Sequence, residues 1–179
     1  MTSAFLILVL YSKDDDNWKV ADFGLTCEGT TRRDNTTRYA RGTIGYRSPE
    51  LTTSPGTFNN KVDIWALGCV LFELAARKKA FDNDWRIMEY AQSAGRSSRP
   101  EFPPLSVTQR CQTYLQELAF SMLSIKASDR PNARSVLEAV KSLGEMAPVC
   151  LLDNQRRLKP LIKWLEGPDW STVKWVPFW

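Results

Sequence analysis

The pattern of apolar and polar residues predicts a β-hairpin near the start of the chain. Phe5–Tyr11 holds Leu, Ile and Val without Gly or Pro, which is typical of a buried strand. The acidic stretch Ser12–Asn17 predicts a turn, and Trp18–Ala21 predicts a second short strand. The apolar run has no basic segment before it and is too short to cross a bilayer, so we expect neither a signal peptide nor a membrane span.

Two polar stretches and two helical patterns follow this hairpin. Leu25–Arg41 and Thr52–Asn60 show no apolar period and predict loops. Lys61–Ala76 has apolar residues on nearly all sides, which predicts a helix buried in a core. Trp85–Ala94 is a weaker amphipathic segment and predicts a second helix.

Capping residues predict two further helices. Ser106 and Gln109 fit a capping box, in which each of the two side chains satisfies a free backbone amide at the start of the helix. Asn132 fits the N-cap of a last helix, and Gly144 fits its C-terminal end. The residues of this last helix that should face inward are Val136, Ala139, Val140 and Leu143.

Composition limits the class of protein. The 179 residues suffice for one domain with a core, and 43% hydrophobic and 25% charged residues are ordinary for a globular protein. The net charge of +4 does not by itself indicate nucleic-acid binding. The chain contains no histidine, which excludes Ser-His-Asp and Cys-His catalysis within it. The four cysteines are widely spaced without a C-x-x-C motif, so we expect reduced thiols in a cytoplasmic or nuclear protein.

An ordered set of short motifs carries the functional information. The tripeptide DFG at Asp22–Gly24 precedes the block GTIGYRSPE at Gly42–Glu50. Asp63 opens the pattern D-x-W-x-x-G in the predicted buried helix, and Arg130 opens an Arg-Pro pair farther along. A single tripeptide recurs by chance, but the whole ordered set resembles the C-terminal lobe of a eukaryotic protein kinase, from about Leu6 to Leu143.

This resemblance implies a mainly α fold, the C-terminal helical lobe of the protein kinase-like α+β fold with a short N-terminal β-hairpin. We expect a partial kinase domain over residues 1–147 and a Trp-rich C-terminal tail over residues 148–179. The implied activity is ATP-dependent transfer of phosphate to protein serine or threonine. Thr43 favours this serine/threonine type, because tyrosine kinases usually carry Pro and Trp in the same block.

The resemblance also implies the nucleotide site. Asp22 is the expected ligand of the Mg²⁺ that bridges the ATP phosphates, since a carboxylate at a strand end offers a hard oxygen. Leu8 is the expected apolar residue beneath the adenine ring. Phe23 should pack inward in the active arrangement, and Gly24 lets the backbone turn. The alternative for Asp22 is a plain turn carboxylate.

Substrate contacts and regulation are expected in the residues that follow. The backbone from Gly42 to Tyr46 would form the pocket for the residue after the phosphoacceptor, and Thr43 would orient the catalytic Asp of the family. In the preceding loop a phosphothreonine would pair with Arg and order the segment. The candidate modification sites are Thr30, Thr31, Thr36 and Thr37, and an ordinary polar loop is the alternative.

Three more residues are expected to have structural roles. Glu50 and Arg130, 80 positions apart in the sequence (130 − 50), resemble the two partners of a buried ion pair in the family. Asp63 resembles the acid at a helix start that holds the backbone of the catalytic loop. A helix-start acid that is favoured by the helix dipole is equally consistent with Asp63.

Much of the kinase machinery is missing from the sequence. Only 21 residues precede Asp22, and they contain no G-x-G-x-x-G loop, no His-Arg-Asp base and no strand Lys for phosphate. Phe5 and Leu6 occupy the place of the Asn that binds a second magnesium in the family. We therefore expect no catalytic residue in this chain, no phosphate transfer by the chain alone, and weak or absent binding of ATP and Mg²⁺.

Two interpretations stay open. The chain is either part of an active kinase cut short or a non-catalytic, pseudokinase-like module that binds other proteins. In the second case the tail is the expected contact, because its tryptophans lie among basic residues. Docking of these tryptophans on the lobe itself is the alternative, and nucleic-acid binding by the tail lacks a recognisable fold. We expect a protein substrate, no nucleic acid and no membrane.

Overall fold

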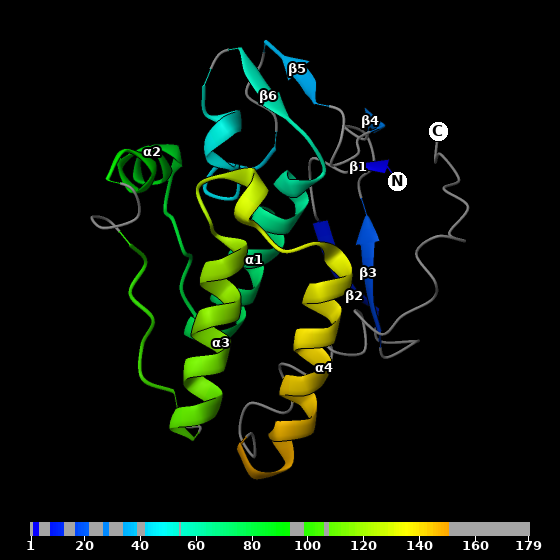
Figure 1. Ribbon diagram of the computed structural model, residues 1–179, viewed down its shortest axis with the longest axis vertical. Coiled ribbons are helices and arrows are strands. Elements are labelled where there is room, and N and C mark those ends of the chain that lie inside the picture. Colours follow the sequence, from blue (N-terminus) through cyan, green and yellow to red (C-terminus); the bar gives the residue numbers. More distant parts are fainter. Residues whose placement is uncertain are drawn as a thin grey trace.

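The computed structural model describes residues 2–3, 8–12, 17–21, 27–28, 34–38, 42–53, 55–93, 99–105 and 108–150, with side chains from residue 34 to residue 143 within these ranges. In this part of the chain the fold is mainly helical, as predicted. The helices are α1 (Lys61–Ala76), α2 (Asp84–Gln92), α3 (Gln109–Met122) and α4 (Ala133–Cys150), with the 3-10 turns η1 (Pro49–Leu51) and η2 (Ala127–Asp129). Figure 1 shows α1, α3 and α4 side by side, and α1–α3 and α3–α4 are in contact.

In the described ranges, three antiparallel strand pairs accompany these helices. The predicted hairpin is confirmed, since β2 (Leu8–Ser12) pairs with β3 (Asn17–Ala21), from Leu8 opposite Ala21 to Ser12 opposite Asn17. The other pairs join β1 (Thr2–Ser3) to β4 (Cys27–Glu28) and β5 (Asn35–Thr37) to β6 (Gly56–Phe58).

The β4, β5 and β6 strands contradict part of the prediction, because they lie in the two stretches that were expected to be loops. Asn35–Thr37 and Gly56–Phe58 are rich in threonine, whose branched Cβ suits an extended backbone. β5 and β6 have three residues each and β4 has two, which is too short for an alternating pattern to appear in the sequence. Pairing of β5 with β6 therefore gives a regular structure to two segments for which the sequence pattern predicts no strand.

The α1 helix has the predicted bounds and forms the centre of the core. Its buried residues lie on nearly all sides, in agreement with its uniformly apolar sequence. The helix ends at Ala76, and its C-cap Arg77 has a φ of 57°, the left-handed conformation that commonly closes helices. At Gly68 an added Cβ would come within 2.9 Å of the Met122 Cβ and 3.2 Å of Leu123 Cδ2, so α3 approaches α1 closely at this glycine.

Three apolar clusters of the described residues include parts of α1, and two of them are large. The first joins α1, α3 and α4 through Ile64, Leu67, Leu71, Ala75, Leu115, Leu118, Ala119, Met122, Val136, Val140 and Leu143. The second joins α1 to α2 and the loop between them through Trp65, Cys69, Phe81, Ile87, Tyr90 and Leu123. The Trp65 and Phe81 rings stack with their centroids 5.6 Å apart, which fixes this loop against the core.

The capping predictions had mixed outcomes. The capping box at Ser106 and Gln109 is wrong, because α3 begins at Gln109 and Thr108 is its N-cap, with Oγ1 accepting a hydrogen bond from the Cys111 amide at 3.4 Å. Ser and Thr are both good caps, so the sequence alone left the choice open. The Asn132 cap is confirmed, because its Oδ1 accepts from the Ser135 amide at 2.9 Å.

The predicted end of the last helix is wrong. Val136, Val140 and Leu143 are buried as predicted, and Ala139 is half-buried, but α4 runs through Gly144 to Cys150. A glycine inside a helix costs about 1 kcal/mol relative to alanine, an amount that packing of the rest of α4 readily offsets. The predicted boundary between residues 147 and 148 therefore falls within α4, and residues 151–179 lie outside the described part.

The expectation of four reduced cysteines is also wrong. Cys69 is free and buried, but Cys111 is disulfide-bonded. Wide spacing in the sequence cannot reveal which cysteines the fold brings together. Within the residues that the structure describes, no helix is both long and apolar enough to span a membrane.

Candidate functional site

The predicted nucleotide site falls largely outside the described residues. Asp22, Phe23 and Gly24 are not described, and neither are the candidate modification sites Thr30 and Thr31. Leu8 lies in β2 opposite Ala21, which ends β3 directly before Asp22. The backbone therefore puts Leu8 opposite the last described residue before the DFG tripeptide, and the side chain of Leu8 is not described.

The segment from Gly42 to Leu51 forms the best-defined part of the predicted site. Gly42 and Gly45 have φ values of 91° and 84°, which L-residues with a side chain rarely adopt. At Gly45 an added Cβ would lie 2.6 Å from the Phe81 carbonyl oxygen, so a side chain does not fit there. The Tyr46 amide donates a hydrogen bond to the Thr43 carbonyl at 3.1 Å, which closes a turn over residues 43–46 that contains Gly45. Thr43 itself is exposed.

Tyr46 ties this segment to α1. Its hydroxyl donates a hydrogen bond to the Glu73 carboxylate. Burial, together with the Glu73 hydrogen bond and charge, raises the pKa of Tyr46 well above that of an ordinary tyrosine. The phenol therefore stays neutral at physiological pH and remains a donor to Glu73.

Asp84, at the start of α2, accepts two hydrogen bonds from the same segment. Its Oδ1 accepts from the Gly45 amide at 3.1 Å, and its Oδ2 accepts from Arg47 Nη1 at 2.6 Å. The Arg47 Nε then donates to the Gly42 carbonyl at 2.8 Å. One carboxylate thus fixes both the backbone and a side chain of the turn.

The sequence did not reveal the three polar side chains whose hydrogen bonds hold this segment, Glu73, Arg47 and Asp84. Asp84 follows Asn83, whose Oδ1 caps α2 by accepting from the Arg86 amide at 3.1 Å. An acidic residue in the first turn of a helix is usually explained by the helix dipole, so nothing in the local sequence indicated that Asp84 also binds the Gly42–Leu51 segment. Only the positive φ of Gly45, which a lone glycine in a turn can suggest, could have drawn attention to this contact.

The structure brings Glu50 and Arg130, which lie 80 positions apart in the sequence, into contact. Arg130 Nη1 and Nη2 donate to Glu50 Oε1 and Oε2 at 2.6 and 2.8 Å. The Arg130 side chain is fully buried, and that of Glu50 is 19% exposed. This two-pronged geometry gives the strongest kind of carboxylate–guanidinium pair.

Every N–H group of the Arg130 guanidinium has an acceptor. Besides Glu50, Nε donates to the Ser124 carbonyl at 2.8 Å, Nη1 to the Lys61 carbonyl at 3.1 Å and Nη2 to the Ile125 carbonyl at 3.0 Å. A buried charge is tolerated when its hydrogen-bonding groups are all satisfied. Arg130 therefore joins the end of the Gly42–Leu51 segment, the start of α1 and the turn before η2.

Lys61 and Asp63 lie in the first turn of α1, next to this pair. The Lys61 ammonium donates to the carbonyls of Arg130 and, at 3.2 Å, Pro131. Burial, and then the Arg130 charge, lowers the pKa of Lys61. Asp63 is half-buried at the helix start, so its position agrees with either of the two roles considered for it.

The two described candidate modification sites differ in accessibility. Thr36 and Thr37 both lie in β5, where Thr36 is exposed opposite Thr57 and Thr37 is buried opposite Gly56. Thr36 is therefore accessible at the surface of the described part, whereas Thr37 is not.

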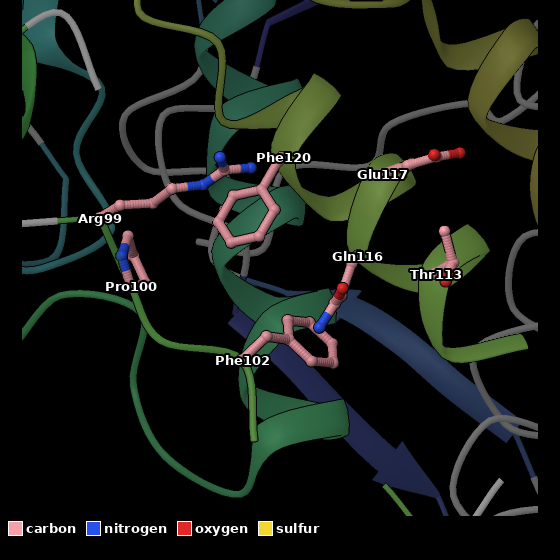
Figure 2. A pocket seen from close by; sticks show the side chains of 7 residues that line it. All are labelled: Arg99, Pro100, Phe102, Thr113, Gln116, Glu117 and Phe120. Carbon is pink, nitrogen blue, oxygen red and sulfur yellow. The ribbon is translucent and has the colours of Figure 1, made fainter. Parts of the chain in front are cut away.

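A separate hollow of about 350 Å³ lies between α3 and the loop that precedes it. Figure 2 shows the Arg99 guanidinium over the Phe120 ring, and its carbon lies 3.8 Å from the ring centroid. None of the residues singled out from the sequence lines this hollow. Its walls are Arg99, Pro100, Phe102, Thr113, Gln116, Glu117 and Phe120.

The described side chains do not form a metal site. In this part of the chain, His, Cys, Asp and Glu nowhere gather in a group of three or more that could hold an ion. The residues that are described therefore do not fit Mg²⁺. Asp22 is the only candidate ligand from the sequence, and it lies outside them.

Comparison with known proteins gives consistent results. The pattern of the protein kinase domain matches residues 7–140. The chain is 33% identical over 172 residues to the serine/threonine-protein kinase Nek8 of Danio rerio, which covers 94% of this chain and 23% of that protein. It is 38% identical over 97 residues to Nek4 of Mus musculus, which covers 54% of this chain and 11% of that protein. A wall-associated receptor kinase-like protein of Arabidopsis thaliana is 28% identical over 150 residues, 81% of this chain and 20% of that protein. The chain thus spans less than a quarter of the length of each of these relatives.

Proposed function

Because the chain belongs to the protein kinase family, we propose that its Gly42–Leu51 segment holds the protein substrate during phosphate transfer from ATP to serine or threonine. The observation that supports this proposal is that side chains from three other parts of the chain bind this segment. Glu50 bonds Arg130, Tyr46 bonds Glu73, and Asp84 bonds Gly45 and Arg47. Phosphate transfer depends mainly on positioning, and a segment fixed in this way suits that task.

Thr43 is the residue of this segment that we assign to the reaction itself. It is exposed, and it lies between two glycines that set the backbone of the turn. An exposed hydroxyl beside the acceptor peptide is free to orient a catalytic carboxylate supplied by another part of a kinase. Gly42 and Tyr46 contribute backbone and shape to the substrate pocket rather than chemistry.

We propose that the 179-residue chain does not transfer phosphate by itself. It has no histidine, no glycine-rich loop before Asp22 and no His-Arg-Asp base. Asp22 is the proposed magnesium ligand and Leu8 the proposed contact of the adenine ring, and they give too few contacts for firm nucleotide binding. ATP and Mg²⁺ would be used by a protein that supplies the remaining groups.

The first experiment measures transfer of labelled phosphate from ATP by the purified 179-residue chain and by its Asp22→Ala variant. We expect no transfer by either. Transfer by the chain that disappears in the variant would overturn the proposed incompleteness, because a contaminating kinase would not respond to Asp22.

The second experiment tests the serine/threonine assignment in the protein encoded by the complete transcript. Phosphoamino-acid analysis of a general substrate such as casein should give phosphoserine and phosphothreonine. A product dominated by phosphotyrosine would contradict the proposal. Thr43→Ala should lower kcat by about 10- to 100-fold with the KM for ATP little changed, and Thr53→Ala, another exposed threonine, is the matched control.

A non-catalytic binding module is the second candidate function. It is favoured by two large apolar side chains, Ile44 and Trp85, that remain 56% and 65% exposed. Binding of a protein partner without any phosphate transfer by the product of the complete transcript would support this alternative. A role for the Trp-rich tail in such binding stays part of the proposal.

A further inference from the structure

The two most exposed large apolar side chains in the described part of the chain lie close to each other. Ile44 is 56% exposed and Trp85 is 65% exposed, whereas the neighbouring Phe81 and Ile87 are buried. Ile44 precedes Gly45 and Trp85 follows Asp84, and the Gly45 amide donates to Asp84 Oδ1 at 3.1 Å. This hydrogen bond holds the two apolar residues on adjoining parts of the surface, and Figure 1 shows α2 beside the η1 turn that it contacts.

The backbone beneath these two side chains is held in place. Asp84 bonds both Gly45 and Arg47, and the Asn83 side chain caps α2 immediately before Trp85. An exposed tryptophan on a fixed backbone loses little conformational entropy when a partner covers it. Tryptophan is also strongly enriched among the residues that dominate binding energy at protein interfaces.

Basic residues surround this apolar pair. The stretch from Arg77 to Arg86 carries four basic residues and two acidic ones. Of these six charges, Asp84 is paired with Arg47 and Arg86 with Glu89, which leaves Arg77, Lys78 and Lys79 against Asp82. Arg77, Lys78 and Lys79 are all exposed, and the Lys79 ammonium lies 5.6 Å from the centre of the Tyr46 ring, which brings this basic run beside the substrate segment. These residues give the surface beside Tyr46, two positions after Ile44, an excess of positive charge.

We propose that Ile44, Trp85 and the basic run Arg77–Lys79 form a docking site for an acidic segment of a protein substrate that carries a large apolar side chain. We call these residues the Ile44–Trp85 face. The apolar side chain would lie on Ile44 and Trp85, and the flanking carboxylates would face Arg77, Lys78 and Lys79. That the partner is a substrate depends on the proposed function, whereas the chemistry of the bound segment depends only on this face.

The test measures binding of two fluorescein-labelled peptides to the full chain by fluorescence polarisation, without ATP. One peptide has a central Leu-Phe pair flanked by Glu residues, and its counterpart has Lys in place of Glu. We expect the Glu peptide to bind at least about tenfold more tightly, and to weaken steeply as salt rises from 50 to 500 mM. Equal binding of the two peptides would overturn the proposal.

Variants locate the binding on this face. Trp85→Ala should weaken binding of the Glu peptide by about tenfold or more, and Trp85→Phe should restore most of it. Lys78→Glu combined with Lys79→Glu should reverse the preference between the two peptides. Arg134→Glu with Lys141→Glu makes the same change of charge on the exposed side of α4 and serves as the control. Unchanged binding in the Trp85 and lysine variants would refute the site.

Two further outcomes would reassign the face. Sedimentation that shows a dimer of the wild type and a monomer of Trp85→Ala would mean that a second copy occupies it, which overturns a substrate segment. Specific binding of the Glu peptide, together with an absence of kinase activity in the complete protein, would sustain the docking chemistry and refute the proposed function. The two proposals therefore fail in distinguishable ways.

Discussion

Glu50→Ala offers the most direct test of what stabilises the described part of the chain. The variant removes both acceptors that lie 2.6 and 2.8 Å from the Arg130 guanidinium. Arg130 keeps its bonds to the carbonyls of Ser124, Ile125 and Lys61, but its charge loses the opposing carboxylate. Because the Arg130 side chain is fully buried, it cannot turn outward to water without disrupting the surrounding packing.

The expected cost follows from this burial. Removal of one partner from a buried ion pair typically destabilises a protein by about 3–5 kcal/mol. Glu50 is 19% exposed, so water can partly replace the missing carboxylate, and we expect the lower end, about 3 kcal/mol. For a chain of this length such a change lowers the Tm by about 6–12 °C.

Urea denaturation followed by circular dichroism measures the free energy of unfolding of the variant. Glu89→Ala is the matched control, since it breaks an ion pair with Arg86 whose side chains are 35% and 55% exposed, and it should cost less than about 1 kcal/mol. Glu50→Gln, which keeps the shape and one acceptor, should fall between the two. If Glu50→Ala destabilises the protein no more than Glu89→Ala does, the pair does not anchor the segment.

Three further predictions concern the segment and the core around α1. Gly45→Ala should lower the free energy of unfolding by about 2–3 kcal/mol, because its φ of 84° and a nearby carbonyl leave no room for Cβ, whereas exposed Thr43→Ala should change it little. Burial raises the pKa of Tyr46 and Tyr90, so the unfolded chain loses these protons first and the free energy of unfolding should fall as the pH rises above about 10. Tyr46→Phe should reduce this fall in urea titrations, and an unchanged fall would refute the contribution of Tyr46. Burial also raises the pKa of the Cys69 thiol, so iodoacetamide at pH 8 should label it only after unfolding, and peptide mapping that finds equal labelling of the native protein would contradict this.

The sequence predicted those parts of the fold that one continuous pattern encodes. The bounds of α1 matched because an apolar run of that length and spacing has few other solutions, and the Asn132 cap matched because its partner is local. The β5 and β6 strands were missed because three residues carry no visible period. The last helix was ended too early because Gly144 is a strong breaker only when packing does not compensate for it.

Less of the candidate site than of the fold could be predicted, because the contacts of the site join residues that are far apart in the sequence. The Glu50–Arg130 contact, across 80 positions, was anticipated from a family resemblance and not from any local feature. The contact of Arg47 with Asp84 spans 37 positions, and each residue by itself reads as an ordinary surface charge. Chain folding alone brings such pairs together, so physical reasoning from one sequence cannot recover them.

The close approach at Gly68 has a consequence for how this protein can change over evolutionary time. An added Cβ there would lie 2.9 Å from the Met122 Cβ, so the separation of α1 and α3 is set at a single point. Because α1 also carries Glu73, which binds Tyr46, a wider separation would shift the position of the Gly42–Leu51 segment relative to the core. Because this contact is with the Cβ atom itself, a shorter side chain at position 122 does not relieve it and only glycine does, so a substitution at Gly68 is expected to occur together with glycine at position 122 among related chains.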